Sequence, residues 1–496
     1  MGNFLDKAIE WANPEAAYKR AAYRKALDAE RNYDAASFGR QNANWRAVNE
    51  SAEITDRMGR DVVRARARDM ERNSDAANAV ISAYKRNVFG AGYRLRVTTE
   101  DDQLNKRLEK LWKKWCKARN CDVTGTQSFN EMMRMIVKRK KVDGGILILK
   151  RYTKDGFIPL KLQCIEVDEL DVNHMVPRNK DNRVVGGIEY NSYNKPVGYF
   201  ICTYEIDGNI NTDPIYVDAK DVIFWYTKHR PSQIREMSDL TATLPRIRDV
   251  NEFIRAVSVK ERILACLSVF IKRLLPQSGL GVGGRNNQQD DEKKYDYNGK
   301  TVSPGMIMNL NVGDDVEVVN PSGQSSDATA FVKQQDRMIA AGQGLSYEAV
   351  SRDMSESNYS SARQGMIEDE LTYSEDSEGL INIMTEIYES FVISCVLAGK
   401  VQIPDFWADK DSYLEHKWIK APKKWIDPKK EAEANKIALN TGQKSWADLA
   451  AEQGKDWKEA IDEIKEIIEY GEQCGIDMRE VMFGGKTGKS TGKEKQ

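Results

Sequence analysis

The chain has 496 residues, more than one compact domain usually holds, so two or more substructures are expected. Hydrophobic residues make up 41% and charged residues 30%, a balance typical of a soluble, folded protein rather than a disordered one. The formal net charge of -1 argues against a simple DNA-coating protein. The first hundred residues hold 14 Arg and 4 Lys against 14 Asp plus Glu, and a solvated, salt-bridged helical face accounts for this excess of +4.

The cysteines and the apolar runs exclude two further classes. The seven cysteines are scattered and odd in number, so neither a disulfide framework nor a zinc site is expected, and a reducing compartment is the natural interpretation. The first residues lack the apolar core of a signal peptide. The longest apolar run, near Ile263 to Ile271, is too short to cross a bilayer and is flanked by Lys and Arg. We therefore expect no association with a membrane.

The N-terminal half of the chain changes from helical to β-rich texture. Residues 14–90 are rich in Ala and Arg with few helix breakers, which predicts mostly helix. Tyr93–Val97 alternates like a strand, and helices are predicted at 102–119 and 129–142. Five β-rich runs separated by turn residues follow, at 145–149, 159–167, 184–190, 197–204 and 214–226. Antiparallel hairpins are the economical arrangement, so residues 1 to about 240 are predicted as one mixed α+β domain.

A long helix is predicted from Pro245 to about Leu275. Its apolar residues step by three, four or seven, which gives one continuous stripe: Val250, Ile254, Val257, Leu264, Leu267, Ile271 and Leu274. A helix of this length needs a neighbour to bury such a stripe. Identical helices from other copies of the chain would supply one, and so would an ordinary intramolecular core.

The segment 276–325 interrupts the helical pattern. It holds a polar glycine-rich loop, a charge cluster at 290–294 and two short strand-like runs at 302–308 and 316–319, a pattern that alone is typical of a hairpin insertion. Further helices are predicted at 327–341, 362–397, 428–439, 445–451 and 456–470, with a polar loop at 351–361. Residues 484–496 are rich in Gly, Lys and Ser and are predicted to be disordered.

No pattern in the sequence predicts a catalytic, cofactor or metal site. Gly279–Gly284 spells G-x-G-x-x-G, but a helix precedes it where the dinucleotide-binding pattern needs a strand. In the run 484–490 the first glycine of a P-loop would fall on Phe483. The three histidines, His174, His229 and His416, come with no G-x-S-x-G elbow, and the acidic pairs have no supporting histidine. We therefore expect that the chain is not an enzyme.

The most informative motif lies near residue 350. Leu345–Asp353 reads LSYEAVSRD and leads into Asn358–Arg363, which reads NYSSAR. This order of a Ser-Tyr-Glu, an Asp and an Asn-Tyr-Ser-Ser-Ala-Arg string resembles the lambda-like family of tailed-bacteriophage portal proteins. Glu236 departs from the pattern because relatives tend to have glycine there, and Gly144-Gly145 lacks the glutamate that often follows, which indicates a distant branch. Further stretches agree with the family at 14–17, 66–73, 90–92, 304–310 and 425–430.

The resemblance implies a helix-rich α+β fold with a wing, a stem, a clip, a tunnel loop and a helical crown. The segments would be 1–244 (wing), 245–275 (first stem helix), 276–325 (clip), 326–344 (second stem helix), 345–400 (tunnel loop and tunnel helix), 401–483 (C-terminal wing and crown helices) and 484–496 (disordered tail). The expected channel residues are Arg352, Asp353, Met354, Ser355, Asn358 and Tyr359. The expected docking residues of the clip are Arg285, Lys293, Lys294 and Tyr295.

The resemblance also implies a head–tail connector, a ring of twelve subunits at one capsid vertex of the virion, assembled in the host cytoplasm. Double-stranded DNA would pass through the ring, and the partners would be terminase, a head-completion or adaptor protein, and the major capsid and scaffold proteins. Many phosphate contacts would hinder transport, so we expect weak DNA binding, with Asp353 and Glu356 offsetting the charge of Arg352. The alternatives are a DNA-packaging enzyme, either a motor or a nuclease, and a capsid component without a channel.

Overall fold

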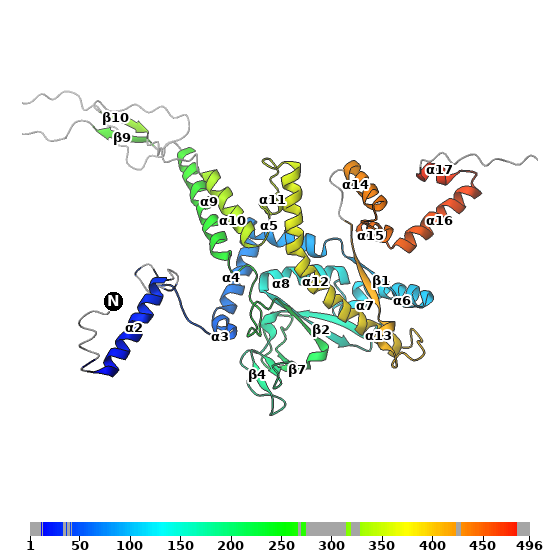
Figure 1. The fold of residues 1–496 in the computed structure, drawn as a ribbon, viewed down its shortest axis with the longest axis horizontal. Coiled ribbons are helices and arrows are strands. Elements are labelled where there is room, and N and C mark those ends of the chain that lie inside the picture. Colours follow the sequence, from blue (N-terminus) through cyan, green and yellow to red (C-terminus); the bar gives the residue numbers. More distant parts are fainter. Residues whose placement is uncertain are drawn as a thin grey trace, which may run out of the picture. The chain divides into compact units, whose positions relative to one another are not determined.

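The computed structural model describes most of the chain and divides it into two compact units, Met1–Thr55 and Asp56–Gln496 (Figure 1). The boundaries predicted at 244, 275, 325, 344 and 400 therefore all fall within the second unit. The mixture of many helices with small antiparallel sheets confirms the predicted helix-rich α+β class. The described residues are Trp11, 13–32, Ala36, Arg40, 42–265, 269–273, 314–318, 328–422 and 428–483. The predicted clip residues Arg285, Lys293, Lys294 and Tyr295 and the predicted tail 484–496 lie outside them.

The first unit contains α2 (Pro14–Asn32). The Asn13 side chain accepts a hydrogen bond from the Ala16 N–H at 3.1 Å, and proline suits the first helical position because its missing N–H would have had no partner there. A second, shorter helix, α3 (Ala52–Arg57), contains the boundary between the two units.

The helices that follow are ended and restarted by their capping residues. Ser74 ends one helix, and its hydroxyl accepts from the Ala77 N–H to begin the next. Asp101 caps a third helix, and Ser128 with Glu131 forms a capping box on a fourth. The predicted helical region 14–90 is therefore several helices. Their bounds are α4 (Arg60–Asn73), α5 (Asp75–Tyr84), the π-helical turn η2 (Lys85–Phe89), α6 (Asp102–Trp115), α7 (Ala118–Cys121) and α8 (Phe129–Asp143).

Two antiparallel sheets confirm the predicted hairpins. The three-stranded sheet has β2 (Gly145–Tyr152) between β3 (Leu160–Ile165) and β8 (Val222–Tyr226). The predicted single run 184–190 is instead a hairpin, because Gly186 and Gly187 at positive φ turn the chain. The four-stranded sheet has the order β4 (Arg183–Val185), β5 (Ile188–Tyr190), β6 (Pro196–Ile201) and β7 (Ile215–Asp218), and the short turns are η3 (Val167–Glu169) and η4 (Ala219–Asp221).

A two-stranded sheet joins distant parts of the second unit. The strand β1 (Tyr93–Val97) pairs antiparallel with β11 (His416–Lys420), so that Leu95 lies opposite Trp418. The ladder continues at both ends, where the Ala421 N–H donates to the Gly92 carbonyl and the Thr98 N–H donates to the Glu415 carbonyl. The sequence predicted the first strand but not its partner.

Two helices, α9 (Leu244–Ala265) and α10 (Ala328–Gly342), lie side by side (Figure 1). The prediction that the first of them continues to Leu275 is wrong, because 269–273 form a strand. This strand, β9 (Val269–Arg273), pairs antiparallel with β10 (Asp314–Val318). Val, Phe and Ile at 269–271 have branched or aromatic side chains that suit a strand, and the pairing outweighs their helical spacing. The strand predicted at 316–319 exists as β10, whereas the run predicted at 302–308 lies outside the described residues.

The core of the second unit is built around α12 (Tyr359–Leu397), which follows the short helix α11 (Tyr347–Ser351). Its C-terminal half buries Leu380, Met384, Ile387, Tyr388 and Phe391. The helix is long and apolar enough to cross a bilayer by length and composition, but the core helix of a soluble protein passes the same test and half of this stretch is buried. The remaining elements are α13 (Lys410–Tyr413), α14 (Pro428–Asn440), α15 (Trp446–Glu452), α16 (Trp457–Gln473) and α17 (Met478–Phe483).

A buried ion-pair network surrounds Glu236, the residue that departs from the family pattern. Its side chain is 0% exposed and accepts from Arg64 Nη1 at 2.9 Å and from Arg235 Nε at 2.8 Å. Arg235 also donates to the carbonyls of Gly186 and Val167, while Arg64 also pairs with Asp168 at 3.0 Å. The network therefore connects α4 to the turn between β4 and β5 of the four-stranded sheet and to the segment before α9.

Candidate functional site

The loop that carries the predicted channel residues begins after α10, at a turn fixed by packing. Gly344 has a φ of 68°, and a Cβ there would lie 3.0 Å from the Thr372 side chain on α12. The Thr372 hydroxyl donates to the Gly344 carbonyl at 2.7 Å. The Ser346 hydroxyl then caps α11 by accepting from the Ala349 N–H, and Asp369 accepts from both the N–H and the hydroxyl of Ser346. The path into the loop is thus held against α12.

The residues 352–358, which we name the 352–358 loop, connect α11 to α12. Arg352 ends α11 in the left-handed conformation, with a φ of 59°. Asp353 Oδ1 accepts from the Ser355 N–H at 3.0 Å, and hydrogen bonds from Ser355 lower the pKa of the Asp353 carboxyl. Asn358 caps α12, because its side chain accepts from the Ser361 N–H at 2.8 Å. Local hydrogen bonds therefore define most of the path of the loop.

Glu356 joins the loop to α10 through two cations. Its carboxylate lies 2.6 Å from Lys333 Nζ and 3.1 Å from Arg337 Nη2, and the hydrogen bond from Lys333 lowers the pKa of the Glu356 carboxyl. The same two cations lie 5.7 Å and 5.4 Å from the centre of the Tyr347 ring. The loop thus neutralises the positive charge that α10 presents next to it.

The expectation that Glu356 offsets Arg352 is therefore wrong. Glu356 pairs with two cations of α10, while Arg352 is exposed and turned into the left-handed region at the end of α11. Arg352 is nearer to Glu356 in sequence than Lys333 and Arg337 are, but the path of the backbone brings the Glu356 carboxylate to α10. A carboxylate four residues away along a loop has no fixed direction, unlike one on a helix.

The predicted channel residues are brought together on one short segment. Arg352, Ser355 and Asn358 are exposed, and Met354 is 56% exposed. Met354 also lines a cavity of about 270 Å³ with Met366 of α12. Nothing is described of the Tyr359 side chain, although its backbone begins α12.

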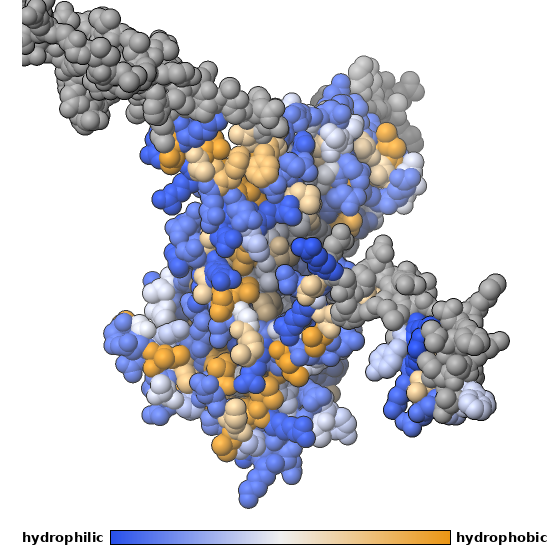
Figure 2. Space-filling model, turned by 90° about the vertical axis from the view of Figure 1, so that its left-hand side faces the viewer, coloured by the Kyte–Doolittle hydropathy of each residue, from blue (hydrophilic) through white to orange (hydrophobic). Residues whose placement is uncertain are grey.

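The two helices α9 and α10 meet through an aromatic pair and a polar contact. The rings of Phe253 and Phe331 lie 4.6 Å apart, and Arg246 Nη1 lies 3.3 Å from Gln335 Oε1. Other apolar side chains on these helices remain exposed, with Ile254 at 47% and Met338 at 45%. Figure 2 shows apolar residues in patches among hydrophilic ones on the face that it draws. The predicted apolar stripe is thus only partly buried within one chain.

A buried polar junction, which the sequence did not reveal, lies where α10 ends. The Tyr84 hydroxyl donates to the Gln343 carbonyl at 2.8 Å. Lys141 Nζ lies 3.5 Å above the Tyr84 ring, and burial lowers the pKa of Lys141 to about 8. Its neighbour Lys140 pairs with Asp239 at 2.9 Å and also with Asp376 of α12. These groups come from five distant segments, so no local pattern could have placed them together.

Two of the three histidines make contacts within the fold. His174 stacks on Phe200 with ring centres 3.8 Å apart, and His416 lies within hydrogen-bonding distance of Thr385 and the Leu414 carbonyl. The described cysteines are free, and within the described ranges no group of three or more His, Cys, Asp or Glu side chains is placed to hold a metal ion.

Comparison with known proteins identifies the family. The model of the phage portal protein family, lambda family, matches residues 38–376. The probable portal protein of Halomonas phage phiHAP-1 is 26% identical over 470 residues, which cover 91% of this chain and 89% of that protein. The portal protein of Escherichia phage N15 is 19% identical and portal protein B of Escherichia phage lambda is 18% identical, each over 87% of this chain and 88% of the relative.

Solved structures give fold matches of lower similarity. A chain from the virion of the native gene transfer agent particle has a TM-score of 0.42 and 13% identity, over 80% of this chain and 99% of that chain. A chain from the neck of the native particle, determined with C12 symmetry, has a TM-score of 0.41 and 14% identity, over 80% of this chain and 99% of that one.

The match of the family model over residues 38–376 defines the class of a phage portal protein. The chain belongs to the lambda family of phage portal proteins, and it is a portal subunit of a bacteriophage.

Proposed function

We propose that this portal subunit forms a ring of twelve at one vertex of the capsid, and that the 352–358 loop lines the channel through which double-stranded DNA passes. Membership of the family supports the ring, as do the exposed apolar side chains on α9 and α10, such as Ile254 and Met338. Neighbouring copies would bury these side chains. The exposed, polar 352–358 loop is the segment of the described chain that matches the expected channel residues.

The pairing of Glu356 with Lys333 and Arg337 is the observation that carries the proposed role of the loop. A conduit must confine DNA without gripping it, and each cation that neutralises a phosphate adds affinity and salt dependence. Glu356 pairs with both cations of α10, so the exposed Arg352 is the cation that remains on the loop, beside Asp353. The other side chains of the loop are hydroxyl, amide and thioether groups. Such groups make weak, exchangeable contacts with a passing duplex.

Substitution of Glu356 tests this role directly. Glu356→Gln keeps the shape of the side chain but frees Lys333 and Arg337, so assembled rings are expected to bind a short DNA duplex more tightly. Two extra phosphate contacts per loop would steepen the slope of log affinity against log salt by about 2 for each loop that touches the duplex. Glu452→Gln is the matched control, because Glu452, the last residue of the separate helix α15, pairs with Lys444 just before that helix.

Filter binding at several salt concentrations measures both quantities, and negative-stain images of the same samples report the rings. An unchanged affinity and slope for Glu356→Gln, or a tight, salt-resistant complex with the unsubstituted protein, would refute the conduit role of the loop. A solution that contains only compact monomers at high concentration would refute the ring.

We further propose that the segment 276–325 docks terminase during packaging and a head-completion or adaptor protein afterwards. The antiparallel pair β9 and β10 supports this role, because a two-stranded sheet leaves outer edges that other strands can pair with. In this proposal the subunit also meets the major capsid and scaffold proteins, is assembled in the host cytoplasm and catalyses no reaction. Exchange of Arg285, Lys293, Lys294 and Tyr295 for alanine should weaken capture of terminase by immobilised rings, and unchanged capture would count against it.

A further inference from the structure

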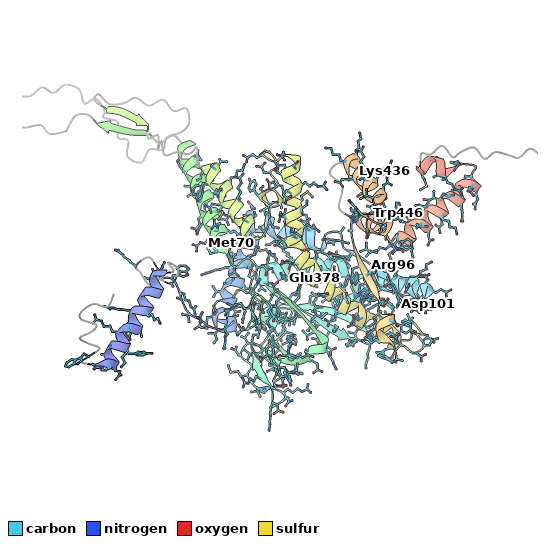
Figure 3. All side chains as sticks on the ribbon, in the orientation of Figure 1. Met70, Arg96, Asp101, Glu378, Lys436 and Trp446 are labelled. Atoms are coloured by element: carbon cyan, nitrogen blue, oxygen red, sulfur yellow. The ribbon has the colours of Figure 1, made fainter. Side chains whose placement is uncertain are left out.

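A groove of about 480 Å³ lies between β1 and α6, away from the 352–358 loop. Its floor is apolar and includes Trp112 and Phe129, which are 6% and 3% exposed. Its walls are the strand residues Tyr93 and Leu95 and the solvent-facing side of α6. In Figure 3, Arg96 marks β1 and Asp101 marks the start of α6.

One edge of β1 faces this groove with backbone groups that β11 does not use. The Gly92 carbonyl and the Thr98 N–H both bond to the β11 side, so the even-numbered residues of β1 form the hydrogen-bonded pairs. The N–H and carbonyl groups of Tyr93, Leu95 and Val97 therefore point to the opposite edge. The Val97 N–H confirms this direction, because it donates to Glu109 of α6 at 3.0 Å. The edge at Tyr93 and Leu95 is left as a template for another strand.

The opposite wall of the groove carries three lysines and one carboxylate, Glu109, which is hydrogen-bonded to β1. Lys106, Lys110 and Lys113 all line it and are exposed. Their spacing of four and three residues places them on one face of α6. No carboxylate of the described chain pairs with any of these three lysines, whereas Arg94 on the strand side is paired with Glu459 of α16. The lysines therefore form an open row of positive charge along the groove.

We propose that this groove binds an extended, acidic peptide segment of a partner protein, which adds to the free edge of β1 as a third strand. Backbone hydrogen bonds to Tyr93 and Leu95 would give affinity, as in other complexes formed by strand addition. The lysine row spans about 10 Å along the helix axis. Alternate side chains of a strand are about 6.6 Å apart, so three alternating carboxylates span about 13 Å, a comparable length.

Charge and shape favour a peptide over the other occupants. The terminal segment 484–496 of this chain has more lysines than carboxylates, so its charge is the wrong sign. A DNA duplex would meet the lysines but would leave the apolar floor and the strand edge unused, since phosphate binding needs neither. An acidic strand with apolar residues at alternate positions uses all three features of the groove.

The proposal can be tested with the full chain and a labelled heptapeptide in which glutamate alternates with valine. Fluorescence anisotropy should detect binding, and the triple variant Lys106→Gln/Lys110→Gln/Lys113→Gln should weaken it about tenfold, as expected for the loss of three exposed ion pairs. The matched control is Lys154→Gln/Lys180→Gln/Lys195→Gln. These three lysines are also exposed, but they lie on loops outside the groove. This control should bind the peptide unchanged, and circular dichroism should show that both variants are folded.

N-methylation of the peptide separates strand addition from simple charge attraction. Only alternate N–H groups of an added strand face β1, so methylation of one alternating set should abolish binding while methylation of the other set should not. Equal effects of the two patterns, or equal binding by the two triple variants, would overturn the proposal. A duplex that binds more tightly than the peptide with the same dependence on the three lysines would also overturn it and identify the groove as a nucleic-acid site.

Discussion

Removal of the Glu236 carboxylate should destabilise the second unit more than removal of any exposed carboxylate. The side chains of Glu236 and Arg235 are 0% and 1% exposed, and that of Arg64 is 5% exposed. Breaking such a buried pair by deleting one partner typically costs about 3–5 kcal/mol, because the remaining charge is left without compensation. Arg64 keeps its contact with Asp168, and Arg235 keeps its carbonyl acceptors, so we expect Glu236→Ala to lower the free energy of unfolding by about 3 kcal/mol.

Urea denaturation followed by tryptophan fluorescence, at one fixed protein concentration, measures this loss. Glu452→Ala is the control: Glu452 is 50% exposed, and an exposed pair contributes about 0–1 kcal/mol. The loss in free energy of unfolding for Glu236→Gln should lie between the losses for Glu236→Ala and Glu452→Ala. Glutamine keeps the volume of the side chain and one acceptor oxygen but loses the charge. A loss below about 1 kcal/mol for Glu236→Ala would refute the view that the two arginines depend on this carboxylate.

Three further substitutions probe the junction between α10 and α12. Lys141→Met should stabilise the protein by about 1–3 kcal/mol at pH 7, because burial lowers the pKa of Lys141 to about 8. The free energy of unfolding of the unsubstituted protein should therefore rise between pH 8 and about 10.5, where the unfolded chain binds the proton that the folded protein has lost. Urea titrations at each pH should show no such rise for the variant. Gly344→Ala should lower the melting temperature more than Gly442→Ala, because both have positive φ but only Gly344 faces Thr372; equal shifts would contradict the contact. Ser346→Ala should cost about 1 kcal/mol and speed hydrogen exchange in α11, whereas unchanged exchange would exclude the cap.

Features set by local patterns were the ones that the sequence predicted well. The helix at 129–142 appears as α8 with a capping box at Ser128, and the predicted helix at 327–341 appears as α10. The strand at Tyr93–Val97 was also predicted, because its alternation is local. The assignment to the portal family rested on the order of short motifs near residue 350, and the match to the family model confirms it.

Features set by distant residues were missed or misjudged. Polar and apolar residues do not alternate clearly in β11, so no local pattern predicts this strand. It forms by pairing with β1, which lies more than 300 residues away in sequence. The helical spacing beyond Ala265 misled the prediction because the competing strand partner, β10, lies about 40 residues further along the chain, within the segment 276–325. At the candidate site, the exposed loop was predicted, but the partners of Glu356 on α10 were not, since they depend on how α10 and α11 pack.

The single long helix α12 has a mechanical consequence. At about 1.5 Å per residue its 39 residues follow an axis about 58 Å long, from the exposed Asn358 cap to the aromatic cluster around Phe391 and Trp112. Figure 1 shows that the helix bends along its length, and where Gly379 meets Trp225 it packs against the three-stranded sheet. The half that follows the 352–358 loop and the half that lies in the core therefore run in different directions, so a change in the bend would reorient the loop relative to the core.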